Sequence, residues 1–504
     1  MQIAFRVDAS LQIGSGHLMR CLTLANKLKE NGDNCTFFCR HLPDNLRSMI
    51  QSNGHQFKLL KNNQASPVVE ENYEIADLAH SAWLGVSQTQ DAHDTIAAMQ
   101  LQIVDWLVVD HYALDFRWQA LLRSKTKHIL VIDDLADRTH DCDALLDQNF
   151  YVDMATRYIS RVPAHCQLLL GPTFALLRPE FAKARQTVKP RTGKVQRIFV
   201  FFGGMDADNV TGQALAALRQ IDLKGIAVDV VIGAQHPARQ TIVADCLRLG
   251  FTCHVQTDNM AALMAMADLA IGAGGSATWE RCCLGLPTIT LVLAENQRQL
   301  VVDGEQQGFL LSSTFNDLGK TLVSLLQQPK KLAQVSHLAM SLVGGDGAFR
   351  ILTKLGMLEI NVRCAEDKDS KDLFNWRNHP TIRAASYNQE LIAWDAHQLW
   401  LSSVLTNPER VLLIGEWNGE KLGVVRYDLN ECEAEISIYL NPDASLRGTG
   451  SDLMKNAEFY LLKNYTHVDT VIANVLPVNI VSHQFFSNNG FSSVAGRYIK
   501  RLKS

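Results

Sequence analysis

Several features that would assign a protein to a secreted, membrane or nucleic-acid-binding class are missing from this sequence. The opening eight residues already include an acid and hold no apolar core of signal-peptide length. Further along, no uncharged apolar run reaches the roughly 18 residues of a membrane span. With a formal net charge of −4, the composition predicts no basic surface for nucleic acid. We therefore expect neither a membrane nor a nucleic-acid partner.

Closely spaced cysteine pairs are missing as well. The 11 cysteines are odd in number and scattered, and no two of them have Cys-x-x-Cys spacing. We expect Cys35 and Cys39, and the adjacent Cys282 and Cys283, to be buried thiols rather than ligands or disulfide partners. Such usage is typical of a reducing compartment, so we predict a cytoplasmic location.

What the sequence does contain is enough chain for two or three domains, because 504 residues exceed what one hydrophobic core usually organises. Its first part alternates short apolar runs with amphipathic stretches. The runs typical of strands are residues 2–8, 34–40, 105–111 and 127–133. Alternation of this kind favours an α/β fold, with a parallel sheet covered by helices on both faces.

A second α/β set follows a polar stretch at residues 183–194, which we interpret as a hinge. Its expected strands cover residues 197–202, 228–232, 269–271 and 288–293, and a long helix is predicted over residues 317–340. Ligands of such sheets bind beyond the carboxyl ends of the strands. We therefore expect a cleft between the two halves.

A third region of different character follows a break at Gly344-Gly345-Asp346-Gly347 and is about 145 residues long. The expected strands mostly neighbour one another along the chain, which predicts a separate mixed α+β domain. They cover residues 411–417, 421–428, 433–440 and 470–475, and helices are expected at 369–378, 451–460 and 480–488.

A glycine-flanked histidine follows the first expected strand. Gly14-Ser15-Gly16 forms a turn into a helix, whose free N–H groups and positive end can hold a diphosphate. His17 lies in the first turn of that helix, where the helix dipole disfavours imidazolium. A neutral imidazole can take a proton from water, as a hydrolase acting at an anomeric carbon requires. By itself, Gly-x-Gly is more typical of a tight turn with a surface histidine.

The complete string, with Asp8, Gly14, Gly16, His17 and Arg20 at these intervals, is more specific. It resembles the opening of the bacterial UDP-2,4-diacetamido-2,4,6-trideoxy-β-L-altropyranose hydrolases of pseudaminic acid synthesis. The resemblance covers roughly residues 1–350 and implies a GT-B-type fold of two Rossmann-like halves, related to the MurG-like glycosyltransferases. It implies His17 as the catalytic base, and a UDP-activated amino sugar in contact with Asp8, Gly14, Ser15, Gly16, Arg20 and Tyr112.

A second glycine turn, with Gly274, Gly275 and Ser276, follows the expected strand at 269–271. The glycines let the backbone approach a phosphate closely, and Ser276 can cap the next helix. One turn later, Glu280 matches an acidic residue that accepts hydrogen bonds from ribose in the MurG-like enzymes; alternatively, it only complements the helix dipole. The resemblance also implies that Asn296, at the end of the strand begun near residue 288, contacts the substrate or the attacking water.

Aspartates end two of the expected strands in the first half, at Asp110 and at Asp133-Asp134. Such carboxylates can bind a metal, but no spacing of His and Asp residues here forms a recognisable metal set. We favour the interpretation that these aspartates cap the helices that follow them. We predict no metal.

The third region carries its own chemical motif, a glycine turn between a strand and a helix. A later series, Asn-x-x-Ser-x-x-Phe-Phe-x-x-x-Gly-Phe, begins at Asn479. This order resembles the GNAT acetyltransferases over residues 358–504 and implies acetyl-CoA as the acetyl donor. By this resemblance, the CoA pyrophosphate and pantetheine arm contact Arg447, Gly448, Thr449, Gly450, Ser451, Asn479 and the backbone of Ile438 and Leu440.

Two positions depart from the GNAT pattern. Ser445 replaces an expected Gln or Arg, and Phe486 replaces the tyrosine that often protonates the departing thiolate. Tyr498, Ser482 or a water must then take that role, and a domain that only binds CoA or is purely structural stays an alternative. For the base that accepts the amine proton, the sequence leaves Glu435, Ser437 and His483 open.

These observations predict a first half with the catalytic histidine (residues 1–185), a second half that binds UDP (195–350) and a GNAT domain (358–504). The expected reaction converts UDP-2,4-diacetamido-2,4,6-trideoxy-β-L-altropyranose to UDP and the free sugar. The fused domain is expected to acetylate the preceding UDP-amino sugar, because fusion raises the local concentration of the next enzyme's substrate. Other sugar-biosynthesis enzymes are expected partners. The alternatives are a GT-B glycosyltransferase and a non-catalytic nucleotide-sugar sensor.

Overall fold

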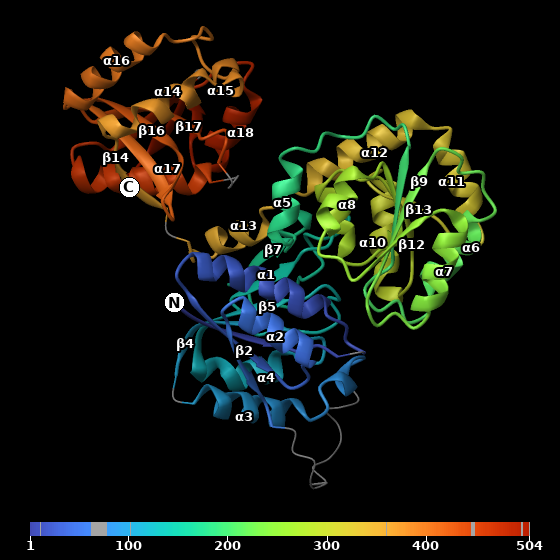
Figure 1. Cartoon of the computed structure of the whole chain (residues 1–504). Helices are drawn as coiled ribbons and strands as arrows, with labels where there is room; N and C mark the ends of the chain where they lie inside the picture. The colour runs from blue at the N-terminus through green and yellow to red at the C-terminus, as the bar shows by residue number, and fades with distance from the viewer. Residues whose placement is uncertain are drawn as a thin grey trace. The chain divides into compact units, whose positions relative to one another are not determined.

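Three sheets organise the computed structural model, which describes residues 1–10, 12–61, 78–100, 102–358, 360–444, 449–494 and 497–502. These residues pack as two units, Met1–Ile351 and Leu352–Ser504 (Figure 1). The first unit holds two sheets of parallel strands, one in each half. The second unit holds one mixed sheet.

The first half is built on seven parallel strands in the order β3-β2-β1-β4-β5-β6-β7. They are β1 Gln2–Val7, β2 Asn34–Cys39, β3 Gln56–Leu59, β4 Val104–Asp110, β5 Thr126–Ile132, β6 Ala144–Asp147 and β7 Gln167–Leu170. The helices are α1 Gly16–Glu30, α2 Asp44–Ser52, α3 Gln88–Met99, α4 Phe116–Leu122 and α5 Pro179–Arg185, with short 3-10 turns η1 Ser81–Trp83, η2 Arg123–Lys125 and η3 Pro172–Phe174. The strand order reverses at β1, and ligands of open α/β sheets bind at such a switch point.

Apolar side chains bury this sheet on both faces. Phe5 and Val7 of β1 are fully buried, as expected for a parallel strand covered by helices on both sides. Arg6, between them, is buried too, and its guanidinium lies 2.7 Å from both Asp8 and Asp91. Because a buried charge destabilises the fold unless it is paired, these contacts tie β1 to α3.

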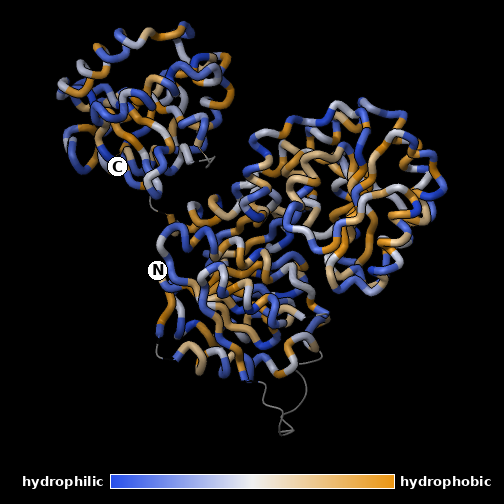
Figure 2. The backbone as a smooth tube through the Cα atoms, in the orientation of Figure 1, coloured by the Kyte–Doolittle hydropathy of each residue, from blue (hydrophilic) through white to orange (hydrophobic). Residues whose placement is uncertain are grey.

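The second half has six parallel strands in the order β10-β9-β8-β11-β12-β13. They are β8 Arg197–Phe201, β9 Ala227–Ile232, β10 Thr252–Val255, β11 Leu269–Ala273, β12 Thr288–Leu291 and β13 Leu311–Ser312. The helices are α6 Val210–Leu218, α7 Arg239–Leu249, α8 Met260–Met266, α9 Ala277–Cys283, α10 Glu295–Gln306, α11 Leu318–Leu326 and α12 Pro329–Leu342, followed by α13 Gly347–Lys354. In Figure 2 the strands at the centre of this half are coloured largely as hydrophobic, in keeping with their burial.

The single long helix predicted over residues 317–340 is wrong, since two helices cover this segment. α11 ends at Leu326 and α12 begins at Pro329. Between them, Gln328 has φ −120° and ψ 59°, outside the helical region, as expected for a residue before proline. Pro329 suits the first position of α12, where no N–H group is needed.

A shared hydrophobic core joins the two halves of the first unit. Tyr151 and Phe181, which follow strands of the first sheet, are buried in the same cluster as Trp279 of α9. Trp279 Nε1 also donates a hydrogen bond to Asn149 Oδ1 at 3.0 Å. α5 packs on α8 and α9, so the chain already contacts the second half before residue 185. The domain boundaries given above stay predictions.

The second unit holds seven strands in the order β14-β15-β16-β17-β18-β20-β19. They are β14 Asn361–Cys364, β15 Arg410–Trp417, β16 Glu420–Asn430, β17 Glu433–Leu440, β18 Thr470–Asn474, β19 Ser492–Val494 and β20 Arg497–Arg501. The helices are α14 Ser370–Asn378, α15 Pro380–Ala384, α16 Trp394–Thr406, α17 Gly450–Asn464 and α18 Ile480–Asn488, with the 3-10 turn η4 Asp367–Asp369. β17 and β18 run parallel, and their pairing stops after Glu435 and Ile472 although both strands continue.

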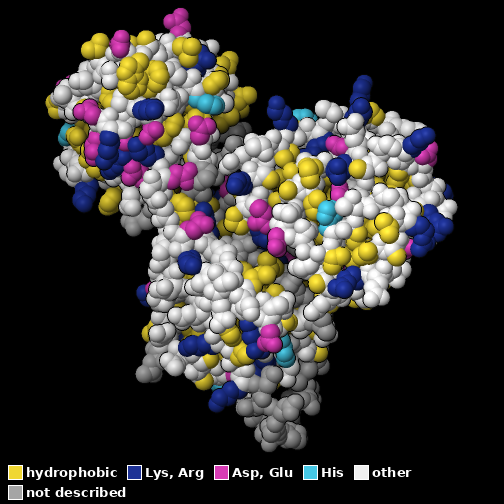
Figure 3. All heavy atoms as spheres, viewed as in Figure 1, with side chains coloured by type: hydrophobic (Ala, Val, Ile, Leu, Met, Phe, Trp, Pro, Cys, Tyr) yellow, Lys and Arg dark blue, Asp and Glu magenta, His cyan; other side chains and the backbone are white. Residues whose placement is uncertain are grey.

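The predicted fold class is confirmed: two parallel α/β halves precede a mixed α+β domain. Cys35, Cys39, Cys282 and Cys283 are buried and free, as expected. On the face seen in Figure 3, basic and acidic side chains are interspersed over both units. Within the described part of the chain, no helix has the length and apolarity needed to cross a membrane.

Candidate functional site

The chain passes from β1 to α1 through the predicted glycine turn. Gly14 has φ +79°, a left-handed conformation that strains a residue with a side chain, and its N–H donates to the Ser10 carbonyl at 2.8 Å. Ser15 and Gly16 are exposed at the start of α1. The first turn of this 15-residue helix presents N–H groups that have no acceptor within the helix. The turn expected to hold a phosphate is therefore open to solvent.

The predicted base, His17, lies in the first turn of α1 and contacts the end of β4. Its Nδ1 is 2.6 Å from Asp110 Oδ1, and its side chain is 10% exposed. Asp110 also accepts two hydrogen bonds of 2.6 Å from Arg20, one turn further along α1. Burial by itself raises the pKa of the Asp110 carboxyl, but Arg20 and His17 outweigh it and hold this pKa well below its usual range. Asp110 is thus ionised at neutral pH.

The ionised Asp110 fixes which nitrogen of His17 carries the proton. A carboxylate only accepts hydrogen bonds, so the 2.6 Å contact places the proton on Nδ1. Arg20 Nη2, 3.2 Å from the same nitrogen, then donates to Asp110 at 2.6 Å rather than to the ring. In the neutral ring, Nε2 then holds the lone pair. Nε2 makes no hydrogen bond to any described residue. It is therefore the atom that can accept a proton from water.

Tyr112 and Asp134 belong to the same cluster. Tyr112 Oη donates to one oxygen of Asp134 at 2.5 Å, and Arg20 donates to the other at 3.1 Å. Burial, together with the Asp134 carboxylate, raises the pKa of Tyr112, so the phenol stays protonated. The Tyr112 and His17 rings meet edge to face, with centroids 4.6 Å apart. The structure thus brings three predicted site residues, His17, Arg20 and Tyr112, into one network.

The interpretation of Asp110 and Asp134 as helix caps is wrong. The cap of α4, the helix after β4, is Asp115. Asp133 does accept a hydrogen bond from a nearby N–H group, that of Ala136, at 2.9 Å. A group of three or more His, Cys, Asp or Glu side chains able to hold a metal is not found among the described residues. The sequence held one indication of the role of Asp110, since it ends a strand expected in the same sheet as the strand before His17.

Asp8, predicted to contact substrate, lies beneath the site. Its side chain is 0% exposed and accepts hydrogen bonds from the N–H groups of Arg40, at 2.7 Å, and His41, at 3.2 Å. It also lies 3.2 Å from His111 Nε2. Burial by itself raises the pKa of Asp8, but Arg6 and His111 together outweigh it and hold this pKa well below its usual range. These contacts join the ends of β1, β2 and β4; a substrate contact of Asp8 stays a prediction.

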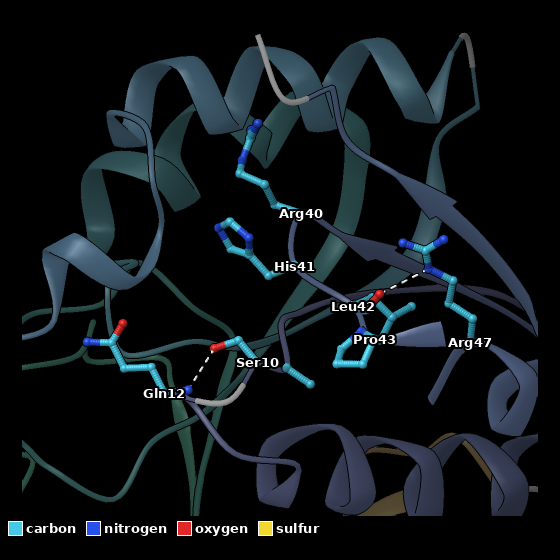
Figure 4. A pocket seen from close by; sticks show the side chains of 8 residues that line it. Ser10, Gln12, Arg40, His41, Leu42, Pro43 and Arg47 are labelled. Atoms are coloured by element: carbon cyan, nitrogen blue, oxygen red, sulfur yellow. Dashed lines mark hydrogen bonds between the residues drawn. The ribbon is translucent and has the colours of Figure 1, made fainter. Parts of the chain in front are cut away.

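An open groove of about 530 Å³ lies beside the glycine turn, at the carboxyl ends of β1 and β2 (Figure 4). Arg40 within it is engaged with Asp91 at 3.0 Å and Asp94 at 2.8 Å. No motif in the sequence points to this groove, because its residues come from two loops and the first part of α2, with no spacing typical of a site. Its lining consists of Ala9, Ser10, Gln12, Arg40, His41, Leu42, Pro43 and Arg47.

In the second half, the predicted glycine turn links β11 to α9. Gly274 packs closely on α10, since a Cβ built there would lie 2.7 Å from Val301 Cγ2. Gly275 is more open, with the nearest atom 3.8 Å from such a Cβ. The expectation that Ser276 caps α9 is wrong: its φ of −56° and ψ of −30° are helical, and its side chain makes no capping hydrogen bond. Ser276 is exposed instead.

Charged side chains lie behind and beside this turn. Arg281 is 1% exposed and donates to the Ala273 carbonyl at 2.6 Å. Burial lowers the pKa of Arg281 to about 10, so the guanidinium stays charged at neutral pH behind the backbone of the turn. Glu280 Oε1 lies 3.3 Å from Arg178 Nη2. Burial raises the pKa of Glu280, and Arg178 opposes this effect.

Asn296 lies in the first turn of α10 and is exposed. The expectation that it ends a strand is wrong, because β12 already ends at Leu291. Its neighbours have other partners: Gln297 accepts a hydrogen bond from the Leu293 N–H at 3.1 Å, and Gln299 donates to a carboxylate at 2.7 Å. Of these three side chains, Asn296 is the one open to a ligand.

In the second unit, the predicted CoA site lies where β17 and β18 stop pairing. Ile438 and Leu440 fall in the part of β17 that has no partner on β18. Thr449 is 0% exposed, and its Oγ1 has no hydrogen-bond partner in the described part of the chain. Gly450 begins α17 and lies against Phe485, and Ser451 is exposed in the first turn. Arg447 and Gly448 lie outside the described residues.

α18 carries the later part of the motif. Asn479 caps this helix by accepting a hydrogen bond from the Ser482 N–H at 3.0 Å, and its contact with pantetheine stays a prediction. Phe486, which replaces the expected tyrosine, is 5% exposed and packs on Tyr498 with ring centroids 5.9 Å apart. Tyr498 therefore brings a hydroxyl-bearing ring into contact with Phe486.

His483 was one of three candidates for the base that accepts the amine proton. Its Nε2 donates to the Leu476 carbonyl at 3.1 Å, because a carbonyl can only accept. Its Nδ1 therefore accepts from Tyr498 Oη at 3.0 Å. Both ring nitrogens are engaged, which leaves Glu435 and Ser437 as the candidates with freer side chains on β17.

Two family models match the chain. Residues 197–343 match the glycosyltransferase family 28 C-terminal domain, and residues 365–491 match the acetyltransferase (GNAT) family. The first match covers the second half with its glycine turn, and the second covers most of the mixed domain. Together they indicate an enzyme in which a domain similar to family 28 glycosyltransferases precedes a domain of the GNAT type.

Similar proteins are found for the whole chain and for parts of it. A Methanocaldococcus jannaschii protein described as uncharacterized is 23% identical over 97% of this chain and 96% of its own length. The UDP-2,4-diacetamido-2,4,6-trideoxy-β-L-altropyranose hydrolase of Campylobacter jejuni is 26% identical over 45% of this chain and 69% of that protein. The crystal structure of Acinetobacter baumannii MurG aligns with 71% of this chain and 99% of its own, at 12% identity and a TM-score of 0.48. The predicted similarity to the hydrolases, with a GNAT domain behind it, is confirmed.

Proposed function

We propose that the first unit hydrolyses UDP-2,4-diacetamido-2,4,6-trideoxy-β-L-altropyranose to UDP and the free sugar. The observation that carries the proposal is the contact between His17 Nδ1 and the ionised Asp110, which leaves the lone pair on Nε2 beside the open glycine turn. The similarity to the Campylobacter jejuni hydrolase supports this choice of substrate.

In the proposed reaction, Nε2 of His17 takes a proton from water while the water oxygen attacks C1 of the sugar. The bond between C1 and the diphosphate oxygen breaks, and its electron pair leaves with UDP. The imidazolium that forms is stabilised by Asp110 at 2.6 Å until it releases the proton to solvent. UDP is already a good leaving group, so a strong general acid is not required.

UDP is proposed to bind the second half. Backbone N–H groups near Gly275 and Ser276 contact the diphosphate, and the buried Arg281 adds positive charge behind the turn. Glu280 accepts hydrogen bonds from the ribose hydroxyls. The family 28 match over residues 197–343 supports a nucleotide-sugar site here. The N–H groups of Ser15 and Gly16 are proposed as further donors to the diphosphate, since the Gly14 N–H already donates to the Ser10 carbonyl.

We also propose that the second unit transfers an acetyl group from acetyl-CoA to the 4-amino group of UDP-4-amino-4,6-dideoxy-N-acetyl-β-L-altrosamine. The amine nitrogen attacks the thioester carbonyl, the C–S bond breaks, the amine loses a proton, and the CoA thiolate gains one. The GNAT match and the unpaired part of β17, whose backbone can pair with pantetheine, support acetyl-CoA binding. Other enzymes of the same sugar pathway are the proposed partners.

A glycosyltransferase is the second candidate, because the matching family model of the second half is that of glycosyltransferases. The two functions separate when the full chain is incubated with the UDP-sugar in ¹⁸O-water without an acceptor. Hydrolysis predicts ¹⁸O in the anomeric hydroxyl of the free sugar and none in UDP. UDP binding without release of any sugar contradicts hydrolysis and favours a transferase or a sensor. Label in the UDP phosphate instead would contradict attack at C1.

A further inference from the structure

Two aromatic side chains that no sequence motif singled out cover Tyr112. Trp83, in η1, stacks on the Tyr112 ring with centroids 5.7 Å apart and an interplanar angle of 29°. His80 lies 5.2 Å from Tyr112 and 4.5 Å from Trp83, again between ring centroids. Tyr112 is only 7% exposed, whereas Trp83 and His80 remain partly exposed. Trp83 and His80 therefore extend the aromatic surface beyond Tyr112, whose ring packs on His17.

One ring nitrogen of His80 lacks a hydrogen-bond partner among the described residues. This nitrogen, Nδ1, is buried. Burial lowers the pKa of His80, so the ring is neutral at neutral pH. A buried ring nitrogen without a partner destabilises the protein unless a ligand or water supplies the missing hydrogen bond. This nitrogen is a candidate contact for a polar substituent on a bound molecule.

The groove beside the glycine turn borders the same segment. His41 lines this groove, and its Nε2 would lie 3.2 Å from a Cβ built on Gly85. Gly85 follows Trp83 by two positions in the sequence. The groove, the two aromatic rings and His17 therefore lie around one region at the carboxyl edge of the first sheet.

We propose that Trp83 and His80 form the sugar subsite of the hydrolase, and that Trp83 selects 6-deoxy amino sugars. This inference rests on the proposed hydrolysis. The indole ring stacks on the C–H face of the pyranose and holds its anomeric carbon near His17, while His80 contacts an acetamido group. An aromatic ring offers a rigid apolar surface, which suits the methyl group of a 6-deoxy sugar. A 6-hydroxyl in the same place loses its hydrogen bonds to water.

The test compares Trp83→Ala and Trp83→Phe with wild type in the full chain. Hydrolysis is measured with UDP-2,4-diacetamido-2,4,6-trideoxy-β-L-altropyranose and with its 6-hydroxy analogue, UDP-2,4-diacetamido-2,4-dideoxy-β-L-altropyranose. Trp83→Ala is expected to lower kcat/KM for the 6-deoxy substrate about tenfold and to narrow the preference between the two substrates. Trp83→Phe is expected to keep most of the activity. Affinity for UDP alone is expected to stay within about twofold of wild type.

A matched control is Trp106→Phe. Trp106 also packs on a histidine, His128, with centroids 4.8 Å apart, but it lies near the start of β4 rather than at its end, where Asp110 is. This variant is expected to keep the kinetics and the substrate preference of wild type. A loss of kcat/KM in Trp106→Phe as large as that in Trp83→Ala would mean that a general change in packing causes the effect, which overturns the subsite.

Failure of the subsite can be told apart from failure of the proposed hydrolysis. Hydrolysis by wild type with unchanged kcat/KM and preference in Trp83→Ala overturns the subsite and leaves the hydrolase standing. If wild type hydrolyses neither substrate, the proposed hydrolysis is wrong, and the subsite is then tested by calorimetry. The subsite predicts that Trp83→Ala abolishes the difference in affinity between the 6-deoxy UDP-sugar and UDP. A difference that persists in Trp83→Ala overturns the subsite.

Discussion

Replacing Asp110 with asparagine tests how His17 is oriented, with almost no change in shape. Asp110 accepts three hydrogen bonds of 2.6 Å, one from His17 and two from Arg20. The amide of Asp110→Asn keeps one acceptor oxygen, and the charged Arg20 takes it. The amide NH₂ then faces His17 Nδ1 and donates to it, which moves the ring proton to Nε2. In that tautomer Nε2 cannot take a proton from water.

The expected loss follows from the role of a positioned general base. We expect kcat to fall about 10²–10⁴-fold, which corresponds to about 3–5 kcal/mol of lost transition-state stabilisation. Stability also falls, because Arg20 keeps a single carboxylate partner, Asp134 at 3.1 Å. Breaking a buried pair in this way is expected to lower the free energy of unfolding by about 3 kcal/mol. The assay must therefore be run well below the unfolding midpoint of the variant.

The measurement is the rate of UDP release from saturating substrate, with UDP affinity from calorimetry as a check on folding of the second half. Asp133→Asn is the matched control, since Asp133 follows the neighbouring strand β5, is 0% exposed and pairs with Arg138 at 2.9 Å. It is expected to lower stability while keeping kcat within a few fold of wild type. A folded Asp110→Asn protein with the kcat of wild type would refute the orienting role of Asp110.

Three further predictions concern the second half, the first sheet and the acetyltransferase. Glu280→Gln is expected to weaken UDP binding about tenfold, because a neutral amide is a poorer acceptor for ribose hydroxyls. The same variant is expected to weaken the binding of 2′-deoxy-UDP less, and equal losses of affinity for the two nucleotides in calorimetry would contradict the ribose contact. Burial, with Asp134 nearby, raises the pKa of Asp147 to about 8 in the folded protein. The protonated carboxyl therefore makes its full contribution to the free energy of unfolding below about pH 4, and this contribution is lost as the pH rises through 8. Asp147→Asn is therefore expected to raise the free energy of unfolding in urea at about pH 9 by on the order of 2–4 kcal/mol and to leave it unchanged at about pH 4; the opposite order would argue against it. Tyr498→Phe is expected to slow acetyl transfer at least about tenfold, and the double variant that also carries Phe486→Tyr is expected to recover the rate. An unchanged rate in Tyr498→Phe would rule Tyr498 out as the proton donor to the thiolate.

Much of the fold follows from local sequence patterns. β1, β4, β8 and β9 consist mainly of apolar residues, which is why their positions could be predicted to within about one residue. β3, with the sequence Gln-Phe-Lys-Leu, lies at the edge of its sheet, where polar residues are tolerated, and it was missed. The same holds for the edge pair β19 and β20 in the last domain. A polar edge strand carries too little apolar periodicity to be distinguished from a loop.

The site was predictable only in part, because its motifs are local and its partnerships are not. His17 and Arg20 share one helix face, so their spacing marks them in the sequence. Asp110 is 93 positions from His17, and their contact exists because β1 and β4 pair in the sheet. Trp83 reaches the site from η1, a 3-10 turn of three residues that is too short to show a periodic pattern. Contacts of these two kinds depend on the assembled sheet and leave no periodic pattern in the chain.

The central claim is that Nε2 of His17 takes the proton from the attacking water. The most direct test is the single-turnover rate of UDP release by His17→Ala, measured beside its UDP affinity. A fall of about 10²–10⁴-fold in rate, with UDP affinity within about twofold of wild type, is predicted. A folded His17→Ala chain that releases UDP from the sugar at nearly the rate of wild type would contradict it.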